Sequence, residues 1–325
     1  MPQTFPDRSE TRILFAHPAY RFADRLAPRE TGLAFTQATT LDETLAQVGE
    51  ATVLVISGLW RPEMLAAGSR LRFVQACRAG FDQFDLPALR ERDVVLCNAS
   101  GVNVNAVSEH AMALMLAHTR QLSRKRDDQH RRFWHPMIDD PARREDELAG
   151  KTLLIYGLGA IGSRLARLAR ACDMRVIGIK REVSAHDGSA HEVRPPEDWL
   201  ALLPRADMVA LTCPLTEATR NVVDARALAA MPPQCYLVNV ARGGCVDEPA
   251  LIEALAAKRI AGAGLDTTAE EPLPARSPLW GLDNVILTPH SAGETRKYED
   301  NVLDILLENL ARLWRGESAL VNRQA

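Results

Sequence analysis

The sequence predicts an α/β protein with two doubly wound parallel sheets. Short apolar runs alternate with helical patterns along most of its 325 residues, which is typical of parallel strands joined by helices. One long apolar helical stretch, which follows residue 102, interrupts this alternation. Because a chain of this length exceeds one average domain, we expect one α/β unit before residue 102 and a second after it.

The first unit is expected to contain a small parallel sheet. Strands are predicted at 13–16, 53–56, 73–76 and 94–97, with a weaker one near 33–35, and helices near 20–27, 41–48, 62–67 and 86–92. Glycine-containing loops at 57–60 and 78–82 follow two of these strands. Ligands of open α/β sheets bind beyond the carboxyl ends of strands, so both loops are candidate ligand-binding segments. The alternative is that each is only a turn.

The second unit opens on a βαβ pattern with a glycine-rich turn. An apolar run at 153–156 is followed by G-L-G-A-I-G, by apolar residues at helical spacing and by a second strand at 174–179. Gly157 permits a tight turn, Gly159 lets the backbone approach a pyrophosphate, and Gly162 lets the helix pack close to the strand. A lone G-x-G-x-x-G is weak evidence, but this context predicts a dinucleotide site. Its loop comprises Gly157, Leu158, Gly159, Ala160, Ile161 and Gly162.

The end of the second strand indicates which nicotinamide cofactor binds. An acidic residue about twenty positions after the first glycine normally bonds the ribose 2′-hydroxyl of NAD. Lys180 and Arg181 stand there instead, and two cations favour the 2′-phosphate of NADP. We therefore expect NADP as the cofactor. The alternatives are NAD, with Glu182 bonded to the ribose, and two solvated charges at a strand end.

Further elements are predicted beyond residue 182 and between the units. Strands are expected at 207–212, 235–240, 262–265 and 285–287, and helices near 197–203, 224–231, 248–258 (capped by Asp247) and 295–315. One long helix is expected over 103–130, with Asn105 as its N-cap and a middle apolar enough to be buried, partly against a second subunit. His110 and His118 on this helix are interpreted as structural histidines. A polar surface loop is expected at 139–150.

Composition excludes several other classes of protein. A hydrophobic fraction of 46% and a charged fraction of 25% are those of a soluble globular chain. A net charge of −3 gives no indication of the positively charged surface that a nucleic-acid-binding protein needs. The longest strongly apolar run, 111–117, is too short for a membrane span, and residues 1–10 lack the apolar core of a signal peptide. The six scattered cysteines predict reduced thiols of a cytoplasmic protein and no metal site.

Three ionisable residues follow predicted strands of the second unit. Arg242, Glu271 and His290 come after the strands at 235–240, 262–265 and 285–287. We therefore expect them at the sheet edge that carries the glycine loop. Taken singly, each has an alternative interpretation as a surface charge or a turn residue.

Together, these side chains suit hydride transfer to a 2-oxo acid. The planar guanidinium of Arg242 matches a carboxylate. His290 would protonate the oxygen on which negative charge grows as hydride arrives, because imidazole titrates near working pH. Glu271, bonded to the imidazole, would orient it and favour its protonated form.

The ordered motifs strongly resemble the D-isomer-specific 2-hydroxyacid dehydrogenase family. The matching segments are G-L-G-A-I-G at 157–162, C-P-L-T at 213–216, N-V-A-R-G-G at 239–244, G-L-D-T-T-A-E-E-P at 264–272 and T-P-H-S-A-G at 288–293. R-A-G-F-D at 78–82 and G-V-N-V-N-A-V-S-E-H at 101–110 also look like family segments. The resemblance covers nearly the whole chain, and the ordered set is far more specific than any one motif.

This resemblance implies roles for individual residues. Arg242 would bind and polarise the substrate, His290 would be the general acid/base, and Glu271, which precedes the proline, would pair with it in preference to Glu270. The backbone N–H groups of Ala79 and Gly80 would bind the substrate carboxylate. The predicted substrate residues are Trp60, Arg78, Ala79, Gly80 and Arg242. The nicotinamide half of the cofactor would be lined by Thr212, Pro214, Val240, Ala241 and Asp266, and the other predicted cofactor-binding residues of this edge are Thr219, His290 and Gly293.

The family also implies an architecture and a partner. A Rossmann cofactor domain (103–293) would be inserted into a smaller flavodoxin-like substrate domain (1–102 plus 294–325), and the chain would form a homodimer through its cofactor domains. Lys180 stands where many members have aspartate, and Thr267-Thr268 replaces a larger apolar pair.

Substrate identity and one other function stay open. Arg78 is either a second cation for a diacid or phosphorylated substrate or a solvated charge. Glyoxylate, hydroxypyruvate, phenylpyruvate and other 2-oxo acids all fit the motifs. The alternative function is a nucleotide-sensing corepressor with weak turnover, because the family includes such proteins.

Overall fold

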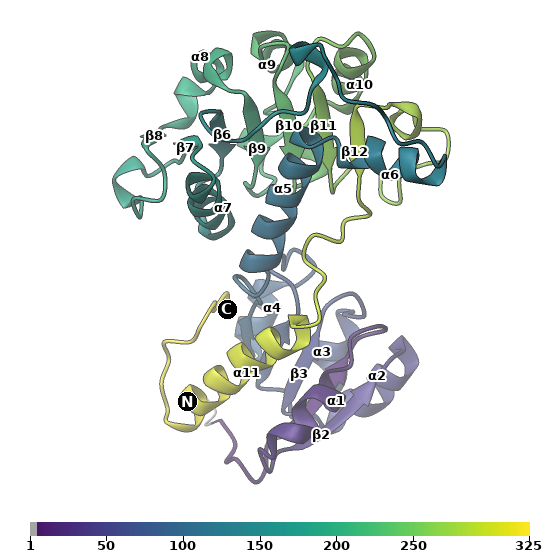
Figure 1. Cartoon of the computed structure of the whole chain (residues 1–325). Helices are drawn as coiled ribbons and strands as arrows, with labels where there is room; N and C mark the ends of the chain where they lie inside the picture. Colours follow the sequence, from purple (N-terminus) through teal and green to yellow (C-terminus); the bar gives the residue numbers. More distant parts are fainter. Residues whose placement is uncertain (1–4) are drawn as a thin grey trace. The chain divides into compact units, whose positions relative to one another are not determined.

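The computed structural model describes residues 5–325, which form two α/β units (Figure 1). One unit comprises the chain up to Asn103 together with Thr295–Ala325, and the other is Val104–Glu294. Each unit contains one parallel sheet, of five strands in the first and seven in the second. The predicted class, α/β with two parallel sheets, is confirmed.

The first unit is built on a sheet of order β2-β1-β3-β4-β5. Its strands are β1 (Arg12–Ala16), β2 (Ala34–Ala38), β3 (Val53–Ile56), β4 (Phe73–Ala76) and β5 (Val95–Cys97), and its helices are α1 (Phe22–Leu26), α2 (Leu41–Gln47), α3 (Glu63–Ala67), α4 (Leu86–Glu91) and α11 (Tyr298–Trp314). Every residue of β3 and β4 is buried. Central parallel strands have both faces covered, which explains why these segments are almost continuously apolar in sequence.

Helix α11 returns the end of the chain to the first unit. Its Val302, Leu306 and Leu310 are fully buried in the same apolar cluster as Phe15 of β1. Figure 1 shows this yellow helix beside the purple α1, which it contacts. The predicted amphipathic helix is therefore present, and its apolar stripe faces the core.

The second unit has the strand order β12-β11-β10-β9-β6-β7-β8. The strands are β6 (Thr152–Tyr156), β7 (Arg175–Ile179), β8 (Glu192–Arg194), β9 (Met208–Leu211), β10 (Tyr236–Asn239), β11 (Gly262–Leu265) and β12 (Val285–Leu287). The helices are α5 (Val104–Thr119), α6 (Leu122–His130), α7 (Ala160–Ala171), α8 (Trp199–Leu202), α9 (Ala225–Ala230) and α10 (Glu248–Ala256). The strand order reverses between β6 and β9, which creates the switch point where such sheets bind ligands.

Both faces of this sheet are buried. Leu153 and Ile155 of β6 belong to the apolar cluster that includes α5, whereas Leu154 and Tyr156 belong to the cluster on the other face. Neighbouring residues of a strand point to opposite faces, so one short run supplies both cores. Among residues 5–325, no helix combines the length and apolarity that a membrane span requires.

The single helix expected over 103–130 is wrong. Helix α5 ends at Thr119 and α6 begins after Gln121, whose φ of 49° places it in the left-handed region. The Thr119 carbonyl accepts a hydrogen bond at 3.0 Å from the backbone N–H of Asp146, so the polar loop occupies an acceptor at the end of α5. The expected N-cap is also wrong, because Asn105 lies inside α5.

Candidate active site

The glycine loop joins β6 to α7 at the switch point of the second sheet. Gly157 has a φ of 105°, and a Cβ atom added to it would lie 2.7 Å from the backbone nitrogen of Cys213. A Cβ atom on Gly162 would collide with the carbonyl oxygen of Gly157. A Cβ atom on Gly159 would meet no other atom within 4 Å. The outer glycines are thus required by packing, whereas the middle one faces open space.

The start of α7 offers donors to an anion at this loop. Gly159 is the N-cap and supplies no side chain, and the first helical residues are Ala160 and Ile161. Their N–H groups have no acceptor within the helix. The backbone N–H groups of Gly157 and Leu158 bond the carbonyl of Ile179 at 3.1 and 2.9 Å, which fixes the loop against β7. These features fit the pyrophosphate of a dinucleotide.

Lys180 and Arg181 follow β7 directly. The ammonium of Lys180 donates to the carbonyl oxygen of Leu158 at 3.1 Å, so its charge lies beside the glycine loop. Arg181 and Glu182 are exposed, and the Arg181 side chain has no partner among residues 5–325. The guanidinium of Arg181 is therefore available to a ligand.

His290 and Glu271 form a hydrogen-bonded pair beyond the ends of β12 and β11. The Nδ1 atom of His290 lies 2.7 Å from the Oε2 atom of Glu271, and both side chains are partly exposed. The other carboxylate oxygen, Oε1, accepts from the Thr268 N–H at 3.1 Å. Because Nδ1 is occupied, the Nε2 atom is the one that His290 presents for proton transfer.

Asp266 holds the segment that carries His290. Its carboxylate is buried and accepts from the backbone N–H groups of Ser291 at 3.0 Å and Ala292 at 3.1 Å. Its backbone oxygen accepts from the N–H of His290 at 2.8 Å. The φ of His290 is 53°, in the left-handed region that few non-glycine residues adopt. The bonds from Asp266 help to hold the segment in this conformation.

Two further side chains extend this network. Thr288 donates its hydroxyl hydrogen to Asp266 at 2.6 Å, because a carboxylate can only accept. The Nε2 atom of His110 lies 2.9 Å from the same hydroxyl and must then be its donor. His110 on α5 and Thr288 after β12 are thus joined to the His290 segment, although neither was singled out for the site from the sequence.

Arg242 stands beyond the end of β10, next to β11 in the sheet. Asn239 is buried and shapes the turn: its Oδ1 accepts from the N–H of Ala241 at 3.0 Å, and its Nδ2 donates to the carbonyl of Arg242 at 3.0 Å. A Cβ atom on Gly243 would collide with the carbonyl of Thr268. The loop of Arg242 therefore packs directly on the loop of Glu271. The Arg242 side chain is exposed, and among residues 5–325 no carboxylate pairs with it.

The remaining predicted cofactor residues lie at the same edge of the second sheet. Thr212, after β9, donates its hydroxyl to the Gly157 carbonyl at 2.7 Å. The Thr219 hydroxyl donates to the Pro214 carbonyl at 2.6 Å. Val240 and Ala241 are buried after β10, and Gly293 follows the two residues that Asp266 holds. Their predicted role in binding the cofactor stays a prediction.

The predicted substrate residues of the first unit follow β3 and β4. Trp60 is only 5% exposed, and its ring lies 4.8 Å from that of Phe84, so much of it serves the core. Arg78 is exposed, and its side chain has no hydrogen-bond or ion-pair partner among the described residues. The carbonyl of Ala79 accepts from Asn98 at 2.7 Å, which holds the loop that continues into Gly80.

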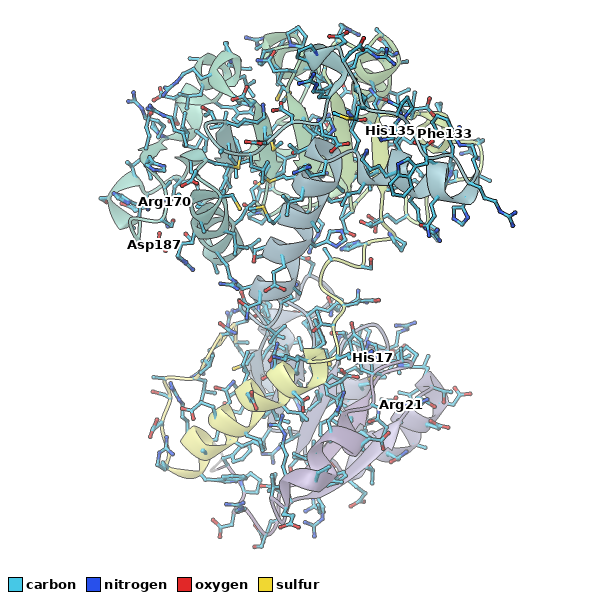
Figure 2. The ribbon with its side chains drawn as sticks, in the orientation of Figure 1. His17, Arg21, Phe133, His135, Arg170 and Asp187 are labelled. Carbon is cyan, nitrogen blue, oxygen red and sulfur yellow. The ribbon has the colours of Figure 1, made fainter. Side chains whose placement is uncertain are left out.

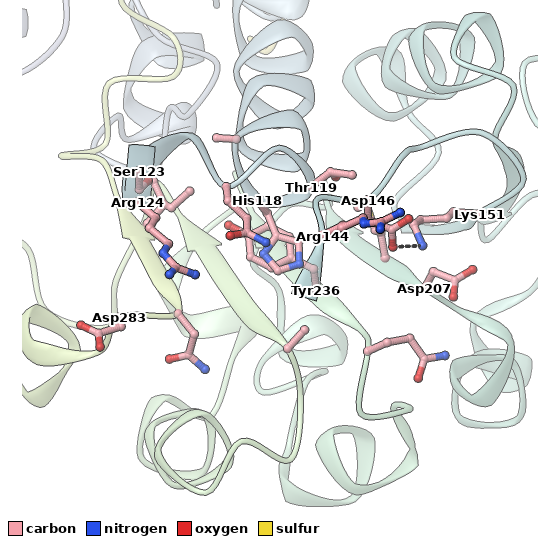
Figure 3. Close-up of a pocket in the computed structure, with 17 residues that line it drawn as sticks. His118, Thr119, Ser123, Arg124, Arg144, Asp146, Lys151, Asp207, Tyr236 and Asp283 are labelled. Atoms are coloured by element: carbon pink, nitrogen blue, oxygen red, sulfur yellow. Dashed lines mark ion pairs between the residues drawn. The ribbon is translucent and has the colours of Figure 1, made fainter. Parts of the chain in front are cut away.

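A hollow at the opposite edge of the second sheet contains none of the predicted site residues. His118, Lys151 and Tyr236 line it (Figure 3), the last two at the amino ends of β6 and β10. Ligands of open sheets bind at the carboxyl ends of the strands, so the hollow is separate from the candidate catalytic residues. The rings of His118 and Tyr236 stack at 3.8 Å, in agreement with a structural histidine.

Comparisons with known proteins agree with this geometry. The sequence profile of the D-isomer specific 2-hydroxyacid dehydrogenase NAD binding domain matches residues 112–292. The glyoxylate reductase of Pyrococcus furiosus is 35% identical over 286 residues, which cover 85% of this chain and 83% of that protein. The D-3-phosphoglycerate dehydrogenase of Methanocaldococcus jannaschii is 32% identical over 95% of this chain, but the chain spans only 58% of that relative.

Solved structures extend the likeness to the whole chain. A D-isomer specific 2-hydroxyacid dehydrogenase family protein from Aeromonas salmonicida has a TM-score of 0.84 at 28% identity and covers 98% of this chain and 99% of its own. The enzyme of this name from Xanthobacter autotrophicus, in complex with NADPH and MES, has a TM-score of 0.79 at 26% identity, with 97% and 98% of the two chains covered. The chain therefore belongs to the D-isomer-specific 2-hydroxyacid dehydrogenases, a family of NAD(P)-dependent oxidoreductases.

Proposed function

We propose that the chain reduces a small 2-oxo acid to the D-2-hydroxy acid with NADPH, and catalyses the reverse reaction with NADP⁺. The observation that carries this proposal is the 2.7 Å contact between His290 and Glu271, at the sheet edge where the glycine loop and Arg242 also lie. A nucleotide-sensing module needs no oriented proton donor, so this contact favours an enzyme over a corepressor.

The roles of the side chains follow from their chemistry. The bound nicotinamide supplies or accepts the hydride. Arg242 binds the substrate carboxylate through its planar donors and polarises the carbonyl. His290 gives a proton from Nε2 to the carbonyl oxygen as negative charge develops there. Glu271 accepts a hydrogen bond from Nδ1, which orients the ring and stabilises the imidazolium before the proton leaves.

NADP is the proposed cofactor because of the two cations after β7. A 2′-phosphate near Leu158 and Ile179 would be within reach of Lys180, which already contacts the glycine loop. Arg181 is exposed and adds a second donor set. Charge-assisted hydrogen bonds of this kind are stronger than neutral ones. The solved neighbour from Xanthobacter autotrophicus also carries NADPH, which supports this preference.

The substrate is proposed to be a 2-oxo acid whose carboxylate binds Arg242; a part for the N–H groups of Ala79 and Gly80 in substrate binding stays a prediction. Arg78 has no hydrogen-bond or ion-pair partner among the described residues and would favour a second negative group on the substrate. Comparing glyoxylate with a 2-oxo diacid tests this role. Arg78→Gln should weaken reduction of the diacid and leave glyoxylate unaffected.

A homodimer through the second unit is proposed from its exposed apolar side chains. Trp134 and Met137 are 96% and 98% exposed and follow α6. Figure 2 labels the neighbouring Phe133 at the periphery of this unit. Trp134→Glu should convert a dimer to a monomer in size-exclusion chromatography with light scattering. Trp280→Glu is the matched control, because Trp280 is also exposed, at 58%, but lies outside this segment.

A cytoplasmic location is our prediction, because that compartment keeps thiols reduced.

The central experiment measures nicotinamide oxidation with each cofactor against a panel of 2-oxo acids. We expect turnover with NADPH, and loss of turnover in His290→Ala with NADPH binding retained. A protein that binds NADPH yet reduces no 2-oxo acid would contradict the enzyme assignment and favour the sensing module.

A further inference from the structure

Two buried cysteines touch each other beneath the proposed active site. The sulfur atoms of Cys213 and Cys245 lie 4.0 Å apart, and the two residues are 6% and 0% exposed. Cys213 follows Thr212 at the end of β9, and Cys245 ends the short turn that begins after Arg242. All six cysteines are free. Nothing in the proposed hydride transfer uses this pair.

Each cysteine belongs to a segment of the site. The backbone of Cys213 packs against Gly157 so closely that a Cβ atom there would lie 2.7 Å from its nitrogen. The N–H of Cys245 bonds the carbonyl of Arg242 at 3.1 Å. A bond between the two sulfurs would therefore join the glycine loop to the turn of Arg242.

We propose that Cys213 and Cys245 form a redox-sensitive pair, which a hydroperoxide converts to a disulfide that switches off the neighbouring site. The consequence for turnover rests on the proposed function, whereas formation of the bond does not. A disulfide needs the sulfurs about 2.05 Å apart, so they must approach by about 2 Å. A displacement of about 1 Å in a catalytic group can lower a rate on the order of a hundredfold.

One molecule of hydrogen peroxide oxidises one pair of thiols. The Cys245 thiol loses its proton, and the thiolate attacks a peroxide oxygen. The O–O bond breaks, Cys245 becomes a sulfenic acid, and the departing hydroxide takes up the proton that Cys245 lost. The Cys213 sulfur then attacks the Cys245 sulfur, and the S–O bond breaks. The displaced hydroxide takes up the Cys213 proton. Two thiols are oxidised to one disulfide, and hydrogen peroxide is reduced to two molecules of water.

The electrostatic setting separates Cys245 from three of the other thiols. The pKa of Cys245 is lowered, first by its hydrogen bond with Cys213 and also by the charge of Arg242. Burial raises the pKa of Cys77, Cys97 and Cys235 to about 12 each. Because the thiolate is the reactive form, oxidation should begin at Cys245.

The test treats the full-length, reduced protein with hydrogen peroxide. Intact mass should fall by two hydrogen atoms, and digestion without reductant should yield a peptide that links Cys213 to Cys245. Reduction of a 2-oxo acid by NADPH should fall at least about tenfold and recover with dithiothreitol. Cys245→Ser should reduce the 2-oxo acid at the same rate before and after treatment with hydrogen peroxide. Cys172→Ser, outside the pair, should respond like the parent protein.

Cys213→Ser provides the second variant. It should retain a sulfenic acid on Cys245 that dimedone traps, without the linked peptide. Absence of the linked peptide from the oxidised parent would overturn the proposed bond. A linked protein with an unchanged rate would overturn the switch. If the reduced protein turns over no 2-oxo acid, the proposed function fails instead, and the switch is judged by NADPH affinity before and after linkage.

Discussion

The Nδ1 atom of His290 lies 2.7 Å from the Oε2 atom of Glu271. This contact selects one imidazole nitrogen for the carboxylate and leaves Nε2 for the substrate. It also explains why two residues separated by a strand in the sequence work as one group: each follows a neighbouring parallel strand, and parallel strands end at a common edge.

Removal of His290 tests the proton donor. His290→Ala should lower kcat on the order of a hundredfold or more while NADPH still binds. Glu271→Gln keeps a hydrogen-bond acceptor but removes the charge beside the imidazole, so kcat should also fall, by less than in His290→Ala. Steady-state kinetics of both variants and of the parent, with NADPH affinity measured by fluorescence titration, give the answer. Near-normal kcat in His290→Ala would refute this role.

Arg242→Lys tests bidentate recognition of the carboxylate. Lysine keeps the charge but lacks the planar fork, so kcat/KM should fall steeply for every 2-oxo acid that the parent reduces. The affinity for NADPH, measured by fluorescence titration, should change little. Unchanged kinetics would mean that Arg242 only supports its loop.

Lys180→Asp tests cofactor choice. Charge-assisted hydrogen bonds contribute roughly 1.5–3 kcal/mol each, and the lower value suits side chains that stay wet. That value corresponds to about a tenfold preference per residue. The ratio of kcat/KM for NADPH and NADH should therefore exceed one in the parent and reverse in Lys180→Asp. Lys258→Asp, the same charge change on another exposed lysine after α10, should leave the ratio alone. A parent that prefers NADH would end the proposal.

Thr288→Val tests the network behind His290. The variant removes the hydroxyl that joins His110 to Asp266, so the His290 segment loses one of its restraints. We expect kcat to fall about tenfold with little change in NADPH affinity. Thr288→Ser keeps the hydroxyl and should restore kcat. If the serine variant is as impaired as the valine variant, the methyl group and not the hydroxyl matters.

The sequence predicted most strands because their residues are continuously apolar. The exception is β8, an edge strand in which Val193 stands between Glu192 and Arg194. No apolar run marks such a strand. Nothing in the sequence indicates the break at Gln121 either, since neither glycine nor proline stands there.

Contacts between residues that are far apart in the chain could not be predicted from the sequence either. His110 and Thr288 are 178 positions apart, and only the fold brings α5 and β12 together at Asp266. The pairing of Cys213 with Cys245 has the same origin. By contrast, the sequence could predict that Arg242, Glu271 and His290 lie together. Each follows a strand that the sequence predicts, and neighbouring parallel strands end at the same edge of the sheet.

The buried His118 should make stability depend on pH. Its pKa is lowered to about 4, first by burial and also by the charge of Lys151, against an opposing effect of Asp146. Between pH 6.5 and 4 the unfolded chain therefore binds a proton that the folded chain does not. The free energy of unfolding should fall as pH decreases through this window, by about 3 kcal/mol at most, and change no further from this group below pH 4.

His118→Phe isolates this effect. Phenylalanine keeps a ring to stack on Tyr236, 3.8 Å away in the parent, but it cannot take up a proton. Urea unfolding at pH 7.5 and pH 5, followed by Tyr and Trp fluorescence, should show a smaller loss of stability in the variant than in the parent. His17, whose pKa burial also lowers to about 4, lies in the other unit and should keep its own contribution. Equal losses in His118→Phe and the parent would show that His118 is not the group that acid protonates on unfolding.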